Sequence, residues 1–202
     1  FTASETLQAN PTVTFSIGDT DNLSPTVTNV SGNDYTATYI IETGQNGLVS
    51  YSISSYTDIL GNSGSLISNS SSITVDTEPP ILTTVALQSD NTDTTKAISD
   101  DTITLSITAS EIITTPTVSF TIGSTNVSPN VSGSGTSYTA TYEILSGQNG
   151  SLSFSISSYA DNAGNNGSSV TTTTLVEKQE GFGSIESITI CNGSANAAVV
   201  TL

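Results

Sequence analysis

"YTATYIIETGQNGLVSYSISSYTDILGN" (35–62) recurs as "YTATYEILSGQNGSLSFSISSYADNAGN" (138–165), and this repetition is the strongest indication of the fold. Apolar residues alternate with Ser and Thr in both copies, as Tyr35, Ala37 and Tyr39 do in the first. A period of two is typical of antiparallel strands that are buried on one face only. "GQNG" separates two such runs in each copy and predicts a tight turn between strands. Since no segment shows a sustained 3.6-residue period, we expect an all-β protein.

The repeat extends further along the chain, because "FTASETLQANPTVTFSIG" (1–18) matches "ITASEIITTPTVSFTIG" (107–123). A period of about one hundred residues corresponds to one domain per repeat. In the second repeat, strands are expected near 81–88, 102–109, 116–122, 126–131, 136–145, 151–158 and 168–176. This number of strands predicts a β-sandwich. The expected domains are 1–78 (repeat 1, lacking its first strands), 79–177 (repeat 2, complete) and a C-terminal strand tail at 178–202.

The charge balance excludes several classes of protein. The 202 residues include 18 Asp and Glu against 2 Lys, with no His, for a formal net charge of −16. Such a chain does not replace phosphate counterions, so nucleic acid and anionic membrane surfaces are not expected partners, whereas cations are. No apolar run is long enough to span a membrane. Without a His base, an Arg clamp or a Cys/His set for zinc, the chain is predicted not to be an enzyme, and no catalytic or cofactor-binding residue is assigned.

Four short motifs occur in a specific order: "VDTEPP" (75–80), "TASE" after the second expected strand, "YTATY", and "DNAGN" after the sixth. In this order and spacing they resemble the immunoglobulin-like repeats that occur in tandem in bacterial surface adhesins and extracellular stalk proteins. The resemblance implies two tandem immunoglobulin-like sandwiches at an extracellular or cell-surface location. It also implies a non-catalytic, modular role. The expected function is that of a stalk segment of an adhesin or a subunit of a surface filament, with a surface glycan or another cell-surface partner.

A carbohydrate-binding accessory module of a secreted protein is the alternative function. Tyr56 and Tyr159 are the aromatic residues on which a sugar ring would stack. Both tyrosines end a strand just before a turn, where such residues more often pack against a domain edge. The two functions stay open at this point.

Acidic residues recur in loops that the sandwich topology places at one end of a domain. Glu111 falls between the second and third strands and Asp161 between the sixth and seventh, while Asp76 and Glu78 lie on the incoming linker. Carboxylates, with Asn162 and backbone carbonyls, are hard oxygen ligands that suit Ca²⁺. We therefore expect a Ca²⁺ site at the domain junction with these four acidic residues as ligands. The alternative is that Asp161 only shapes a turn by accepting backbone N–H bonds.

The tail "SIESITICNGSANAAVVTL" (184–202) contains a strand, an Asn-containing turn and a second apolar strand. Its apolar residues alternate, at Ile188 and Ile190 and again at Ala198, Val200 and Leu202. The first repeat begins at "FTASE" and lacks a counterpart of residues 81–106. The tail of one copy is thus expected to complete the first sandwich of the next, which joins copies head to tail. The alternative is that the tail starts a further repeat of a longer array.

Overall fold

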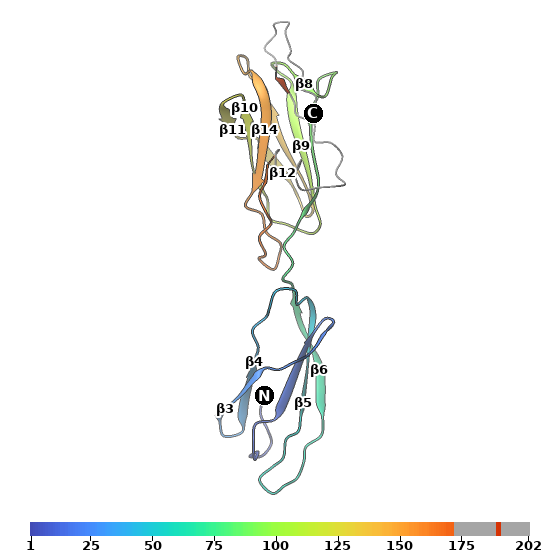
Figure 1. The fold of residues 1–202 in the computed structure, drawn as a ribbon, viewed down its shortest axis with the longest axis vertical. Coiled ribbons are helices and arrows are strands. Elements are labelled where there is room, and N and C mark those ends of the chain that lie inside the picture. Colours follow the sequence, from blue (N-terminus) through green and yellow to red (C-terminus); the bar gives the residue numbers. More distant parts are fainter. Residues whose placement is uncertain (172–188, 191–202) are drawn as a thin grey trace. The chain divides into compact units, whose positions relative to one another are not determined.

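The structure, a computed structural model, describes residues 1–171 and 189–190 (Figure 1). Every secondary-structure element among these residues is a β-strand, which confirms the prediction of an all-β protein. The chain divides into two compact units, Phe1–Glu78 (unit 1) and Pro79–Leu202 (unit 2). Within the described residues, no helix is long and apolar enough to cross a membrane.

Unit 2 contains two sheets. The first has the strand order β12-β13-β9-β7, with bounds Asn130–Ser134, Ser137–Glu143, Thr102–Ala109 and Leu82–Ser89. The second has the order β11-β10-β14-β16-β8, with bounds Thr125–Val127, Thr117–Ile122, Gly150–Ser157, Thr189–Ile190 and Lys96–Ala97. A short strand β15 (Val170–Thr171) also pairs with β14.

The core of unit 2 follows from the alternation in its strands. In β9, Ile103, Leu105 and Ile107 are at most 1% exposed, and the Thr and Ser residues between them are more exposed. Phe120 of β10 and Ile156 of β14, from the opposing sheet, belong to the same buried cluster. Two sheets that each present one apolar face bury those faces against each other, as a sandwich requires.

The single strand expected near 126–131 is in fact parts of two strands in different sheets. β11 pairs with β10, and β12 pairs with β13. Ser128 and Pro129 lie between β11 and β12, and Ser24 and Pro25 occupy the same place in unit 1. Proline has no N–H to donate to a ladder, so the chain leaves one sheet at this dipeptide and enters the other.

"GQNG" forms a turn, but it connects two sheets and not two paired strands. The Gln148 side chain organises this turn, since its Oε1 accepts the Leu145 N–H (2.8 Å) and its Nε2 donates to the Tyr142 hydroxyl (2.9 Å). Gly150 comes so close to Gly123 that a Cβ on it would lie 2.7 Å from the Gly123 Cα atom. With a φ of +121° as well, the Gly150 position favours glycine on two grounds.

Unit 1 has one full sheet and one small one. The full sheet has the order β2-β1-β5-β6, with bounds Thr20–Leu23, Thr12–Ile17, Gly47–Ser54 and Ile67–Val75. The small sheet contains only β3 (Thr26–Ser31) and β4 (Asp34–Thr38). Among the described residues, the counterpart of β9 is limited to the first three residues. Phe1 and Tyr35 exchange two backbone hydrogen bonds of 2.9 Å, and the Ala3 N–H donates to the Asn33 carbonyl (2.9 Å).

Candidate functional site

The turn that begins at Asp161 is held closed by the carboxylate itself. Its Oδ1 accepts the N–H groups of Gly164 (2.7 Å) and Asn165 (2.9 Å). Its Oδ2 accepts the side-chain amide of Asn165 (2.7 Å). The recurring Asp-x-x-Gly-Asn frame is therefore a unit in which the carboxylate at the first position binds the amide at the fifth.

Asp58 makes the same turn in unit 1. Its Oδ1 accepts the N–H groups of Leu60 and Asn62 (both 2.8 Å), and its Oδ2 accepts the Asn62 side-chain amide (2.7 Å). The turn-shaping role that the sequence left open for Asp161 is thus present in both repeats. The amide that bonds Asp161 is that of Asn165, whereas Asn162 was the amide predicted from the sequence as a ligand; Asn at the fifth position of both frames was the available signal.

These hydrogen bonds keep both carboxylates ionised. Burial of Asp161 would by itself raise the pKa of its carboxyl group, but the bonds from Asn165 and the turn N–H groups together lower that pKa below its usual value. For Asp58, the Asn62 side-chain hydrogen bond is the largest cause of a pKa that is likewise lowered. Each turn therefore holds a fixed negative charge at neutral pH.

Two contacts hold the loop after β9 against this turn in unit 2. Ile113 and Asp161 form an isolated antiparallel bridge. The Thr114 N–H donates to the Ala160 carbonyl (2.8 Å), and the Ala160 N–H donates to the Thr114 hydroxyl (3.0 Å). Glu111, two residues before Ile113, is thereby positioned near the Asp161 turn.

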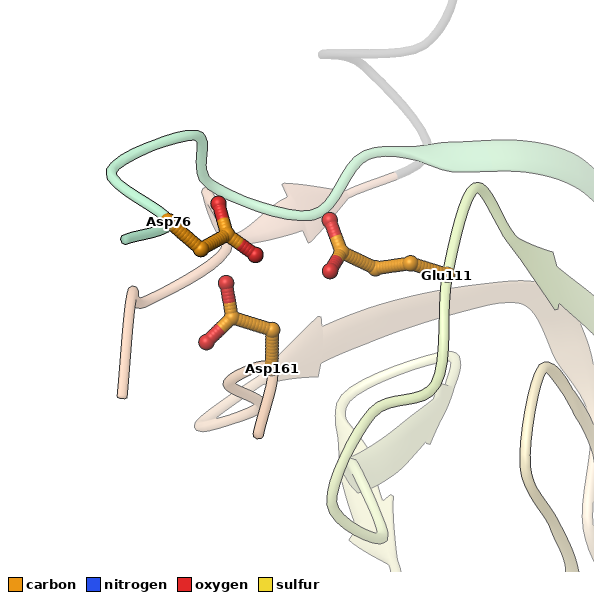
Figure 2. Close-up of side chains that lie close together, drawn as sticks. All are labelled: Asp76, Glu111 and Asp161. Atoms are coloured by element: carbon orange, nitrogen blue, oxygen red, sulfur yellow. The ribbon is translucent and has the colours of Figure 1, made fainter. Parts of the chain in front are cut away.

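Two of the four predicted metal ligands lie close together within unit 2. One carboxylate oxygen of Glu111 lies within 4.8 Å of one of Asp161 (Figure 2). Asp161 is buried and Glu111 is half-buried. The other two predicted ligands, Asp76 and Glu78, belong to unit 1, where the Glu78 N–H donates to Asp76 Oδ1 (3.0 Å).

Tyr159 does not offer a stacking surface to a sugar ring. It is 2% exposed, and its hydroxyl donates to the Ser168 carbonyl (2.7 Å). Gly167 lies against its ring, and a Cβ there would be 1.9 Å from Tyr159 Cε2. Tyr56 lies against Gly64 in the same way in unit 1, and its hydroxyl donates to the Ser65 carbonyl (2.5 Å). These tyrosines pack against the edge of their own domain.

The two units define an all-β chain of tandem immunoglobulin-like sandwiches. No family model matches the chain. A search of curated proteins also finds no match. Among solved structures, the chain is similar to the titin immunoglobulin tandem domains A164-A165, with 10% identity, a TM-score of 0.30, and coverage of 92% of this chain and 84% of that one. It is also similar to the titin domains Z1Z2 in complex with telethonin, with 14% identity, a TM-score of 0.31, and coverage of 93% and 84%.

Proposed function

We propose that this chain is a non-catalytic structural segment of an extracellular protein. It is a stalk segment of an adhesin or a subunit of a surface filament whose copies join head to tail by strand donation. The resemblance of its motifs to bacterial immunoglobulin-like repeats supports the extracellular location.

The main support for this proposal is that one sandwich occurs twice, with the same side-chain hydrogen bonds in both units. The Asp58 and Asp161 turns use the same donor types, and Gln45 bonds Tyr39 and Glu42 as Gln148 bonds Tyr142 and Leu145. A stalk or filament needs a module that folds in the same way at each position, which such repetition supplies. A net charge of −16 also keeps a long assembly soluble.

Assembly of the purified full chain tests the filament form. We expect light scattering and negative-stain electron microscopy to show head-to-tail polymers that grow with concentration and disappear when residues 184–202 are deleted. A chain that stays a monomer at high concentration leaves only the stalk form. For that form, antibodies against the chain should label intact producing cells, and label confined to the cell interior would refute the extracellular role.

Ca²⁺ bound by Asp76, Glu111 and Asp161 is a second part of the proposal, with Glu78 as the fourth predicted ligand. The donor type fits, because Ca²⁺ takes six to eight oxygen ligands. Asp161 already accepts the hydrogen bonds that close its turn, so few of its lone pairs remain for a metal ion. Carbonyl groups and water would then complete the coordination.

A melting experiment with Ca²⁺ and with chelator tests this site. A cation that binds only the folded chain raises the melting temperature by mass action. Glu111→Gln should abolish this rise, whereas Glu143→Gln, which removes the same charge outside the cluster, should retain it. Equal melting temperatures with Ca²⁺ and chelator in the unmodified chain would rule the site out.

A further inference from the structure

We propose that the Asn46–Gly47 peptide of unit 1 is a site of spontaneous deamidation, and that Thr77 holds this site in an unreactive form. Deamidation is a covalent modification that needs water and no enzyme. The "GQNG" turn that contains Asn46 and Gly47 thereby has a chemical property beyond its place as a connection between strands. This property is independent of the proposed structural function.

Deamidation transfers the side-chain carbonyl carbon of an asparagine to the backbone. The backbone nitrogen of the next residue loses its proton and attacks Cγ of the asparagine. A new N–C bond forms, the bond from Cγ to Nδ2 breaks, and ammonia leaves with the proton. Water then opens the five-membered ring at one of its two carbonyl groups, which gives aspartate or isoaspartate. The attack is fastest when the next residue is glycine, because glycine has no side chain to hinder its nitrogen.

The packing of unit 1 requires glycine at position 47. A Cβ atom on Gly47 would lie 2.6 Å from the Cα atom of Gly18, so the two backbones would have to move apart. The φ of Gly47 is +122°, in the region that favours glycine. Gly150 and Gly123 repeat this contact in unit 2, where the same distance is 2.7 Å and the φ of Gly150 is +121°. The fold therefore fixes the second residue of the labile pair.

The segment after β6 requires a side-chain acceptor at position 46. Asn46 Oδ1 accepts the Thr77 N–H (2.6 Å) and lies 3.2 Å from the Thr77 hydroxyl, which is within hydrogen-bond distance. The same hydroxyl accepts the Gly44 N–H (2.9 Å) and lies 3.4 Å from the Gln45 carbonyl oxygen. These contacts fasten the chain after β6 to the turn before β5. Two separate structural demands thus place Asn and Gly next to each other.

The contacts with Thr77 also keep the Asn46 side chain unreactive. Attack requires Cγ of Asn46 to be in contact with the Gly47 nitrogen and aligned with it. A carboxamide whose oxygen is bonded to Thr77 does not turn freely into that alignment. The turn is itself held in place, since the Gln45 side chain is buried and makes hydrogen bonds of 2.8 and 2.9 Å. Asn46 is nevertheless exposed, so water reaches the site once Thr77 leaves it.

Reaction at Asn46 therefore requires a local opening in which Thr77 leaves the turn. The rate of deamidation then equals the rate in an unfolded chain multiplied by the fraction of molecules that are open, as in amide exchange. The loss of one hydrogen bond increases that fraction about fivefold. The folded chain should thus react slowly at Asn46, and removal of the Thr77 contacts should accelerate the reaction.

Peptide mass spectrometry measures the reaction after incubation of the full chain in mildly alkaline buffer. Heavy-oxygen water marks each product, because ring opening introduces an oxygen atom from the solvent. Asn46 should react at least about tenfold more slowly in the folded chain than in the same chain unfolded in urea. Thr77→Val, which removes the hydroxyl, should accelerate the folded-state reaction about fivefold. Thr77→Pro, which also removes the N–H, should accelerate it about tenfold or more.

Two controls accompany these variants. Thr74→Val makes the same chemical change on β6, three residues before Thr77, and should leave the Asn46 rate unchanged. Asn166–Gly167 is the same dipeptide in unit 2, and its rate should be equal in all of the variants. Amide exchange in β1 and β5 that stays as slow as in the unmodified chain shows that unit 1 remains folded.

Three results would overturn the inference. Equal Asn46 rates in the folded and the unfolded unmodified chain would show that the contacts with Thr77 give no protection. Absence of reaction at Asn46 in the unfolded chain would exclude the site itself. Asn46 rates in folded Thr77→Val and Thr77→Pro chains that equal the rate in Thr74→Val would exclude Thr77 as the protecting residue. If Thr77→Pro unfolds unit 1, the comparison of Thr77→Val with Thr74→Val decides alone.

Discussion

Replacing one isoleucine in each repeat by alanine should give very different losses of stability. Ile144 of unit 2 is 1% exposed, and Ile41 at the same place in unit 1 is 42% exposed. Ile144→Ala removes a fully buried side chain and leaves a cavity, which costs about 3 kcal/mol. Ile41→Ala removes a side chain that water already reaches, so only a partial transfer cost of about 1 kcal/mol is expected.

Hydrogen exchange followed by mass spectrometry measures both losses in the full chain. At a concentration too low for assembly, Ile144→Ala should speed exchange in β9 and β13 over a hundredfold. Ile41→Ala should speed exchange in β1 and β5 only about fivefold. Equal losses in the two units would refute the reasoning, because Ile41 would then have to be covered as completely as Ile144. An Ile41→Ala effect that grows when the chain assembles would indicate that a donor strand covers it.

Three further predictions concern the turns and the ion pair between Lys96 and Asp93. Gly167→Ala should destabilise unit 2 by about 1–3 kcal/mol, because the new Cβ collides with the ring of Tyr159; calorimetry measures the loss, and an unchanged melting temperature would contradict it. The pKa of Asp161 is lower in the folded chain than in the unfolded chain, so the ionised carboxylate stabilises the fold. This stabilisation is fully present above the unfolded pKa and is lost as the pH falls through the folded pKa. At pH 7, Asp161→Asn should therefore have a lower melting temperature than the unmodified chain, and the difference between the two melting temperatures should become smaller in acid. A difference that does not change with pH would contradict a stabilising role of the ionised carboxylate. Lys96 bonds Asp93 (2.6 Å) and lowers its pKa to about 2, so Lys96→Gln should raise that pKa in an NMR titration, and no change would exclude the pair in solution.

The sequence predicts the strands well where one face of the strand is buried. The alternation in "TITLSITA" (102–109) places Ile103, Leu105 and Ile107 inward, and the structure buries all three. The sequence does not predict where the chain passes from one sheet to the other. The chain crosses at Ser128 and Pro129, because β11 pairs with β10 and β12 pairs with β13, and the alternation of apolar residues does not indicate these partners.

The candidate site was likewise predicted only in part from the sequence. The sequence identified Asp161 as a special residue because its frame recurs, and it offered both a turn and a ligand role. Which role the carboxylate takes depends on the geometry of Gly164 and Asn165, since their N–H groups must converge on one side chain. Tyr159 is a similar case, because its burial results from a glycine eight residues later and not from its own neighbours.

The ladder between β7 and β9 has a mechanical consequence. The chain enters unit 2 through β7, which pairs antiparallel with β9 from Leu82 to Ser89. Tension pulling on the chain from the direction of Pro79 acts along β7, and the hydrogen bonds of the ladder lie across that direction. When unit 2 is held at the opposite end of β9, the bonds are sheared together and do not open one after another from an end. Unit 2 should therefore resist a pulling force more strongly than its thermodynamic stability alone suggests.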